Sequence, residues 1–432
     1  MENLRPTISR FAQIGCLSCC LVFSQVARLI AGDLVLQKVP PLTVEQVPAY
    51  PQNLARYYLG AQVQAEPQSN PIASLQLSSE SADHNIAEAA LLCDDPTVGY
   101  ALSNGRTALL ISLSKIEDID NISFLNRGAK GDLAVAISSA KLPASSPQWH
   151  KIAQQDLTPD VVKAKIGPSE AKYVTLTFNV TEPGRIASLG FYSTPAVADF
   201  IMPRARKTSV QEKSASFTLI SYNLTDVHEK ARALYVSSGD DLKQANQMID
   251  GQPTTSYSFA ATDAAPCTII DLGKVTTVRR ISAIYSPWRG TVDFYVLQAL
   301  PGAQAAPGAQ AAQKTLRLDD SVLAGLKQVG SVVDDGTGRA AIDFASTSGR
   351  YIMVKWNPAA QQGTAPSVVE IAAFGGREGS PSLVAANRIS AEGKEGKEAK
   401  EVAEGPPAEG PPPSLPDPPP FVFIPEIVPT SP

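Results

Sequence analysis

Short runs in which apolar residues alternate with polar ones recur along most of the chain. Segments such as "TVDFYVLQ" and "YIMVKW" are rich in Val, Ile, Tyr and Phe, and Gly, Pro, Asp or Asn bound them. Alternation with a period of two gives a strand one apolar face, which a sandwich of two antiparallel sheets needs for its core. Helical periodicity is almost absent. The pattern predicts an all-β protein.

The sequence also repeats itself. "LCDDPTVGY" aligns without a gap with "IDGQPTTSY", "SLSKIEDIDNIS" with "DLGKVTTVRRIS", and "YVTLTFN" with "YIMVKWN". Ordered repeats of this kind indicate two copies of one unit of roughly 110 to 150 residues. We therefore expect two tandem antiparallel jelly-roll β-sandwiches, at residues 50–195 and 217–376, joined by a linker at 196–216.

The two ends of the chain differ from these units. Residues 1–32 combine early arginines with an apolar run and predict a signal peptide, although an uncleaved membrane anchor is the alternative. Residues 33–49 are expected to be an N-terminal linker. Residues 377–432 mix charge with proline and predict a disordered tail, whose apolar end "FVFIPEIVPTSP" is either a dock for a protein partner or a terminus without a role. We expect a secreted, periplasmic or cell-surface protein.

Charge and motif content narrow the function. The formal net charge is −5 with 35 prolines and 29 glycines, and no basic block stands out. This balance argues against nucleic acid as a partner. No nucleophile adjoins a histidine, and neither a phosphate-binding loop nor a metal-ligand motif occurs, so we expect no enzyme activity. Cys93 and Cys267 either pair in a disulfide or are two small buried side chains.

The second copy contains a recognisable ordered set of segments. "LYVSSGDD", "NQMIDGQPTTSYSF", "IIDLGKVTTVRRISAI", "GRYIMVKW" and "VVEIAAFG" follow one another. In this order they resemble discoidin-like domains, also called coagulation factor type C domains, of the galactose-binding-like superfamily. The resemblance covers roughly residues 217–376, and residues 50–195 through the repeat. It implies a binding module for sugars or lipid headgroups.

The resemblance also implies a structural calcium ion. Its ligands would be Asp250, Thr255 and Glu370, with backbone carbonyls around Gln252 completing the oxygen shell that a hard cation needs. The alternative is that Asp250 only shapes a turn and Glu370 is a solvated strand residue.

The first copy lacks these three side-chain oxygens. Aligned with the second copy, it has Cys93 for Asp250, Val98 for Thr255 and Arg185 for Glu370. A fixed guanidinium there could replace the positive charge of the ion by bonding the loop carbonyls. We therefore predict a cation in the second copy only.

A turn in "IYSPWRGTVD" supplies the candidate ligand contacts, Tyr285, Trp288 and Arg289. An exposed indole stacks on a sugar ring, and a guanidinium forks hydrogen bonds to hydroxyls. The alternative is that Trp288 folds over an edge of the sandwich.

These features favour a non-catalytic protein that recognises a glycan or cell-surface polysaccharide through its second module. A structural or assembly protein of the cell envelope, using the sandwiches and the tail for protein contacts, is the second hypothesis. A lipid-surface binder is a third. It would need a cationic rim from Arg279, Arg280 and Arg289, and the first two of these point to opposite faces of a strand.

Overall fold

The computed structural model describes residues 33–65, 90–143, 145–193, 222–301, 314–359 and 366–375. All of them belong to one compact unit, Met1–Ala386. The predicted signal peptide, the linker at 196–216 and the tail at 377–432 lie outside the described residues, and so do Cys16, Cys19 and Cys20.

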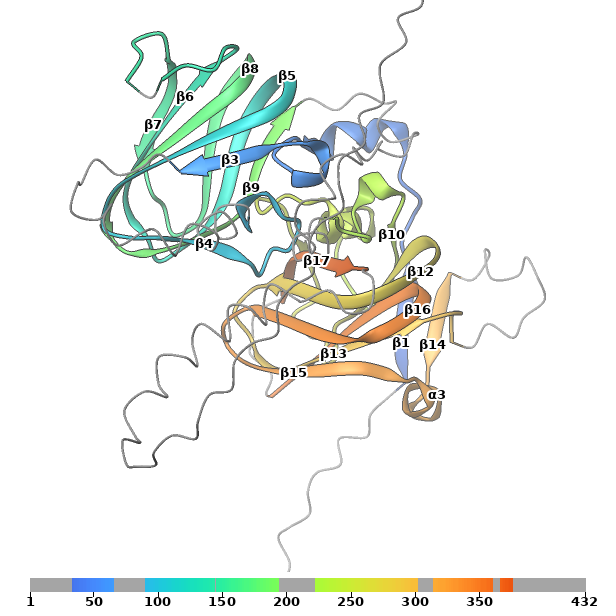
Figure 1. Ribbon diagram of the computed structural model, residues 1–432. Helices are drawn as coiled ribbons and strands as arrows, with labels where there is room; N and C mark the ends of the chain where they lie inside the picture. The colour runs from blue at the N-terminus through green and yellow to red at the C-terminus, as the bar shows by residue number, and fades with distance from the viewer. Residues whose placement is uncertain are drawn as a thin grey trace, which may run out of the picture. The chain divides into compact units, whose positions relative to one another are not determined.

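Two antiparallel sheet systems account for the fold, which confirms the all-β prediction (Figure 1). We call the first system module 1. Its strands are β2 (Gln52–Asn53), β3 (Gln62–Ala65), β4 (Gly99–Leu102), β5 (Gly105–Arg127), β6 (Lys130–Ser138), β7 (His150–Asp156), β8 (Asp160–Glu182) and β9 (Gly184–Ser193). They run in the order β2-β9-β5-β8-β6-β7, with β3 on β5 and β4 on β9.

The second system is module 2. Its strands are β1 (Leu34–Lys38), β10 (Arg232–Val236), β11 (Tyr257–Ser258), β12 (Cys267–Tyr285), β13 (Arg289–Leu297), β14 (Thr315–Leu318), β15 (Gln328–Asp335), β16 (Arg339–Pro358) and β17 (Ser367–Phe374). They run in the order β14-β1-β10-β12-β16-β13-β15, with β17 pairing β11 and β12.

Helical segments are short. They are the 3₁₀ helices η1 (Val44–Ala49), η2 (Tyr57–Leu59), η4 (Ala90–Leu92), η6 (Val227–Glu229) and η7 (Leu242–Ile249), and the α-helix α3 (Asp320–Gly325). Within the described residues, no helix has the length and apolar character needed to cross a membrane.

The residues expected to be an N-terminal linker instead contain β1, which belongs to module 2. Leu34 pairs with Leu318 of β14, and Gln37 pairs with Val236 of β10. Leu34 and Leu36 point into an apolar layer with Tyr235 and Leu318, which explains why the strand docks there. Module 1 is therefore inserted in the sequence between the first strand of module 2 and the rest of it.

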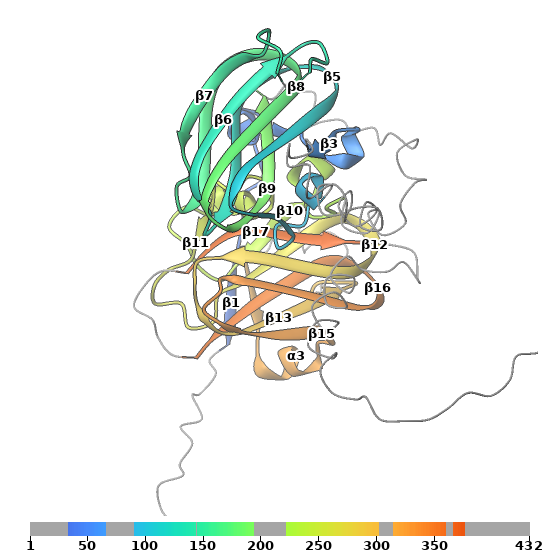
Figure 2. The same ribbon diagram turned by 60° about the vertical axis from the view of Figure 1, so that its left-hand side comes forward.

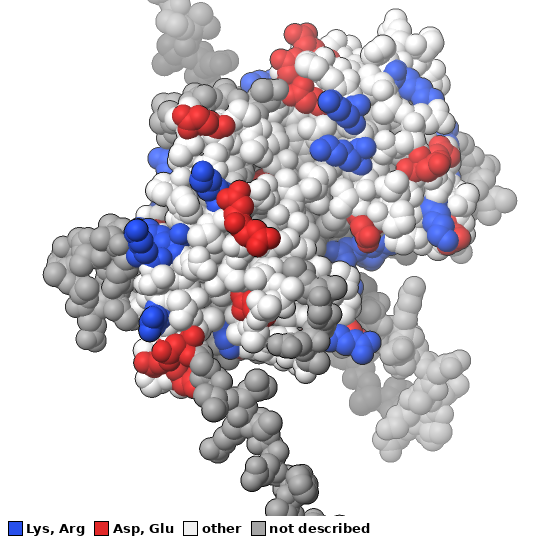
Figure 3. Space-filling model, turned by 180° about the vertical axis from the view of Figure 1, so that it is seen from behind, with Lys and Arg blue, Asp and Glu red and all other residues white. Residues whose placement is uncertain are grey.

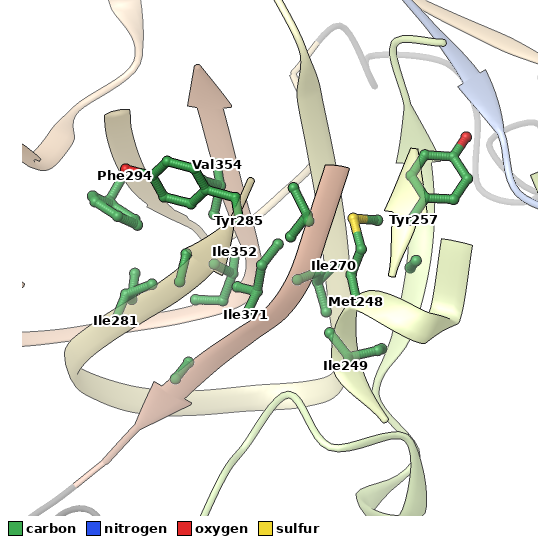
Figure 4. Close-up of a cluster of buried hydrophobic side chains, with 14 of the residues drawn as sticks. Met248, Ile249, Tyr257, Ile270, Ile281, Tyr285, Phe294, Ile352, Val354 and Ile371 are labelled. Atoms are coloured by element: carbon green, nitrogen blue, oxygen red, sulfur yellow. The ribbon is translucent and has the colours of Figure 1, made fainter. Parts of the chain in front are cut away.

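The long strands β12 and β16 pair with each other along most of their length, and the pairing register shifts between Asp271 and Thr276. Ile270, before this irregularity, and Ile281, after it, both pack in one core with Phe294 and Ile371 (Figure 4). The turned ribbon shows the curve of β12 (Figure 2). Each such strand thus contributes to both layers of its sandwich.

Candidate functional site

The loop after η7 is closed by a buried carboxylate. Asp250 is 2% exposed. Its oxygens accept hydrogen bonds from the backbone N of Gln252 at 3.0 Å and its Nε2 at 2.9 Å, and from Oγ1 of Thr255 at 2.9 and 3.0 Å. Buried polar groups are stable only when they are paired in this way. Asp250 therefore shapes the turn, which was the alternative to a role as calcium ligand.

Glu370 of β17 reaches the same loop from the far end of the module sequence. Its Oε2 accepts a hydrogen bond from the backbone N of Gly251 at 2.9 Å, and the residue is 5% exposed. The structure thus brings Asp250, Gln252, Thr255 and Glu370 together. Glu370 is not a solvated strand residue.

Ionising the two buried carboxylates that meet at this loop, Asp250 and Glu370, costs free energy because both are buried. Burial raises the pKa of Asp250 well above its ordinary value. Burial raises the pKa of Glu370 in the same way, and the charge of Asp250 raises it further. A nearby positive charge or a bound proton would relieve this cost.

Module 1 has the same loop with different chemistry, and two asparagines fix the correspondence. Oδ1 of Asn223 accepts from the backbone N of Thr225 and of Ala373, each at 3.0 Å. Oδ1 of Asn53 accepts from the backbone N of Ala55 at 3.0 Å and of Phe191 at 3.1 Å.

Each asparagine is therefore held by the residue two positions after it and by the last strand of its module. One position further along, Arg56 of module 1 corresponds to Asp226 of module 2.

Arg56 provides the fixed guanidinium that was expected in module 1. Its Nη1 donates to the carbonyl oxygens of Cys93 at 3.0 Å and Leu189 at 3.2 Å, and its Nε lies 2.6 Å from Oδ1 of Asp94. Cys93 is the residue that aligns with Asp250. The guanidinium therefore bonds one carbonyl of the loop and one of the last strand β9 from inside the protein.

The sequence alignment assigned this role to Arg185, and that was wrong. Ser123 pairs with Gly190, whereas the aligned Ser282 pairs with Ala372. Two residues earlier on each last strand, the structure places Ser188 where Glu370 stands. Arg185 instead donates to the carbonyl of Gly99 at 2.6 Å. The error arose because ungapped alignment does not register the irregular pairing of β9.

The two loops meet at the contact between the modules, which we call the seam. Oδ2 of Asp94 in module 1 accepts from the backbone N of Asn223 in module 2 at 2.8 Å. In the opposite sense, the hydroxyl of Tyr192 donates to the carbonyl of Gly251 at 2.9 Å. Phe374, which corresponds to Tyr192, packs on Cys93. Each module thus has an aromatic residue near the end of its last strand, Tyr192 or Phe374, and that residue contacts the loop of the other module.

A buried ion pair spans the same seam. Nε of Arg280 on β12 lies 2.6 Å from Oδ2 of Asp95, and the two side chains are 2% and 0% exposed. Nη1 of Arg280 also lies 2.9 Å from Oδ2 of Asp343. Arg280 therefore does not contribute to a cationic rim, because its charge is used inside the protein.

A cavity of about 10 Å³ lies in the seam, enough for a single water-sized species. Its lining includes the charged residues Arg56, Asp94, Asp226 and Glu370. Burial raises the pKa of Asp94 to about 7, although Arg56 opposes the rise. Carboxylates therefore outnumber guanidinium groups around this cavity.

The donor set near Asp250 is of the kind that a hard cation prefers. Carboxylate oxygens of Asp250 and Glu370, the hydroxyl of Thr255 and the carbonyl of Gln252 are all oxygen donors. In the described part of the chain, no group of three or more His, Cys, Asp or Glu side chains could hold a metal ion. A cation here would depend on the hydroxyl and on backbone oxygens.

The turn that was expected to present an indole is built differently. Trp288 is 9% exposed and packs in the module 2 core with Trp356, so it is not a stacking platform. An indole at the start of β13 gains more by covering this apolar core than by facing water. Tyr285 is 5% exposed, and its hydroxyl donates to Oδ2 of Asp334 at 2.7 Å. Of the three candidates, only Arg289 is exposed.

Asp334 organises the turn beneath Arg289. Its carboxylate also accepts hydrogen bonds from the backbone N of Gly336, Thr337 and Gly338, at 3.1, 2.7 and 3.0 Å. Nε of Arg289 donates to the carbonyl of Asp335 at 3.0 Å. The exposed polar residues of this turn include Arg289, Asp335 and Thr337, and Asp335 was not among the predicted ligand contacts.

Both cysteines within the described residues, Cys93 and Cys267, are free and buried. They lie in different modules, and burial raises the pKa of the Cys93 thiol to about 12. They are therefore the small buried side chains of the second interpretation rather than a disulfide.

No family model and no curated protein matches the sequence. Among solved structures, a fucosidase from Ruminococcus gnavus in complex with fucose is 15% identical, with a TM-score of 0.26 over 34% of this chain. The chain spans 27% of the length of that enzyme.

Two further neighbours are covered almost completely. A CBM32 module produced by Clostridium perfringens is 17% identical over 33% of this chain and 99% of its own, with a TM-score of 0.25. A fucolectin from striped bass serum is 11% identical over 75% of this chain and 98% of its own, also with a TM-score of 0.25. At such TM-scores the likeness carries no argument about ligand, and the fold assignment rests on the strand pairing described above.

Proposed function

We propose that the protein is a non-catalytic carbohydrate-binding protein, exported from the cytoplasm, whose module 2 contacts glycan hydroxyls through Arg289 and Asp335. One observation carries this proposal: the exposed guanidinium of Arg289 is oriented by Asp335 on a turn that Asp334 braces from below. Polar groups held in place before binding lose little conformational entropy on contact with a ligand. A planar fork of N–H donors beside a carboxylate suits the vicinal hydroxyls of a sugar.

A panel of immobilised glycans, probed with the full chain, tests this function. Arg289→Ala should weaken binding to any captured glycan by about 10- to 100-fold, the loss of a charge-assisted hydrogen bond. Arg317→Ala is the matched control, since Arg317 is an exposed arginine on β14, away from the turn. Equal binding by Arg289→Ala and the parent chain, or capture of no glycan at all, would refute the proposal.

We also propose that module 2 binds a structural calcium ion through Asp250, Thr255, Glu370 and the carbonyl of Gln252. The oxygen-only donor set and the two buried carboxylates support this ion. When bound, it would supply positive charge between the loop and the last strand. The guanidinium of Arg56 is an alternative source of positive charge for this loop. Its Nη2 lies 4.0 Å from the point where a Cβ on Gly251 would be.

An assembly role remains the second candidate, and one observation favours it. Strand β15 is at an edge of its sheet, and its Val333 is 81% exposed. Exposed apolar residues on an edge strand offer a pairing surface to another chain. Light scattering of Val333→Lys against the parent chain separates this role from glycan binding, since only assembly should be lost.

A further inference from the structure

A small apolar contact joins the modules beside the cavity in the seam. Leu125 of β5, Ala187 of β9 and Ile284 of β12 are each less than 10% exposed and pack together, with Val161 and Val369 beside them. Leu125 and Ala187 are direct cross-strand partners. The contact therefore fixes where the neighbouring residues of three strands stand.

Three arginines border this contact. Arg127 and Arg185 lie two residues from Leu125 and Ala187 and are themselves cross-strand partners. Because side chains alternate along a strand, both arginines leave the sheet on the face that carries the apolar contact. Arg339 is the cross-strand partner of Ile284, so the third guanidinium comes from module 2.

The charges of these arginines are poorly compensated. In the stretches that the structure describes, none of the three forms an ion pair, whereas Arg56, Arg280 and Arg350 each do. Burial and the charges of Arg339 and Arg185 lower the pKa of Arg127, and Asp160 is the one carboxylate that acts in the opposite direction. Like charges placed directly opposite each other on paired strands are destabilising.

The positions of the side chains leave the cluster open to a ligand. Arg185 and Arg339 are exposed and Arg127 is half-buried. Figure 3 shows one face of the molecule, on which basic and acidic side chains are interspersed without a broad field of one sign.

We propose that Arg127, Arg185 and Arg339 form an oxyanion site that takes a sulfate or phosphate group at the junction of the two modules. Each guanidinium presents N–H donors in a planar fork that matches such a group, and the anion removes the repulsion among the three. The site draws residues from both modules, so it exists only when they are docked. It does not depend on the proposed glycan contact at Arg289.

Titration of the full chain with sodium sulfate tests the site. Isothermal calorimetry should give saturable sulfate binding, with sodium chloride at matched ionic strength as the reference for screening. Arg127→Gln should weaken sulfate binding about 10-fold or more. Arg317→Gln removes one exposed positive charge elsewhere and should leave the affinity unchanged. Phosphate in place of sulfate shows whether the site takes both oxyanions.

A charge reversal gives a second readout that does not depend on affinity. Arg339→Glu places a carboxylate beside Arg127 and Arg185, so the melting temperature without sulfate should rise while the sulfate response disappears. Sulfate also stabilises proteins by exclusion from their surface, and this general effect should persist equally in every variant. The proposal is overturned if Arg127→Gln and Arg339→Glu bind sulfate as the parent chain does, or if the parent chain shows an adventitious ion only, without saturation.

Discussion

Modules 1 and 2 place opposite charges at the same point of the same fold. Where module 1 has Arg56 and Cys93, module 2 has Asp226 and Asp250. Arg56 donates to the loop carbonyl of Cys93 in module 1, while the carboxylate of Asp250 accepts from the loop of module 2. At this one position of the repeated unit, module 1 supplies positive charge and module 2 negative charge, whereas the Arg280–Asp95 ion pair crosses the seam in the opposite sense.

This complementarity explains why the two modules pair with each other. An internal repeat that docks through equivalent surfaces resembles a symmetric dimer, in which each contact occurs twice. Tyr192 on Gly251 and Phe374 on Cys93 are one such reciprocal pair. Two copies of module 2 docked in this way would bring carboxylates together without a guanidinium between them.

The largest expected effect comes from breaking the ion pair across the seam. Arg280→Leu leaves the carboxylate of Asp95 buried without its partner, and we expect the free energy of unfolding to fall by about 3–5 kcal/mol. Urea denaturation measures this change. Arg317→Leu, at an exposed position, should change the stability by less than about 0.5 kcal/mol. A similar small loss in Arg280→Leu would show that the seam contributes little to stability.

The next effect separates the two loops by their response to calcium. If only module 2 binds the ion, the melting temperature should be higher in excess calcium than in a chelator. At a calcium concentration of 100 times Kd, the free energy of unfolding should rise by about 2.7 kcal/mol. Asp250→Asn keeps the shape of the side chain and should remove this response. An equal response in Asp250→Asn would place the ion elsewhere, and no response in the parent chain would mean that Arg56 and bound protons balance the carboxylates.

The smallest effect is a dependence of stability on pH. The pKa of Asp94 is raised to about 7 in the folded protein, and the pKa values of Asp250 and Glu370 are raised as well. A raised carboxyl pKa contributes stability that is complete below the unfolded value and is lost as pH rises through the folded value. We therefore expect stability to fall between pH 4 and pH 7.

Asp94 should account for part of this loss, because burial raises its pKa from an ordinary 3.8 to about 7 in the folded protein. Chemical denaturation at a series of pH values measures the slope, and Asp94→Asn should flatten it. A flat profile in the parent chain would contradict the expectation.

The fold and half of the candidate site were accessible from the sequence. Alternation along "YIMVKW" and the ordered repeats predicted two β-sandwiches, because a strand with one buried face must alternate. The grouping of Asp250, Thr255 and Glu370 followed from the resemblance, and in the structure Thr255 bonds Asp250 while Glu370 accepts from the backbone of Gly251. The sequence also carried a further repeat, "NLAR" at 53–56 against "NLTD" at 223–226, which would have located Arg56.

Other features depended on long-range packing that local patterns do not encode. Trp288 is buried because it covers the core of module 2. The local sequence Pro-Trp-Arg-Gly is compatible both with a buried indole and with an exposed one, so it could not predict this burial. Strand β1 gave too short a pattern to assign to a sheet nearly two hundred residues away. Ser188, with φ of 51°, marks the local irregularity that shifted the alignment of the last strand.

The placement of β1 also governs how this protein must be made. A ribosome delivers Leu34–Lys38 first, yet the partners β10 and β14 emerge only after all of module 1. Module 1 can fold while β1 is still unpaired. Module 2 can complete its sheet only afterwards, when β10 and β14 pair with β1. A gene fragment that starts at residue 217 would therefore encode module 2 without its strand β1.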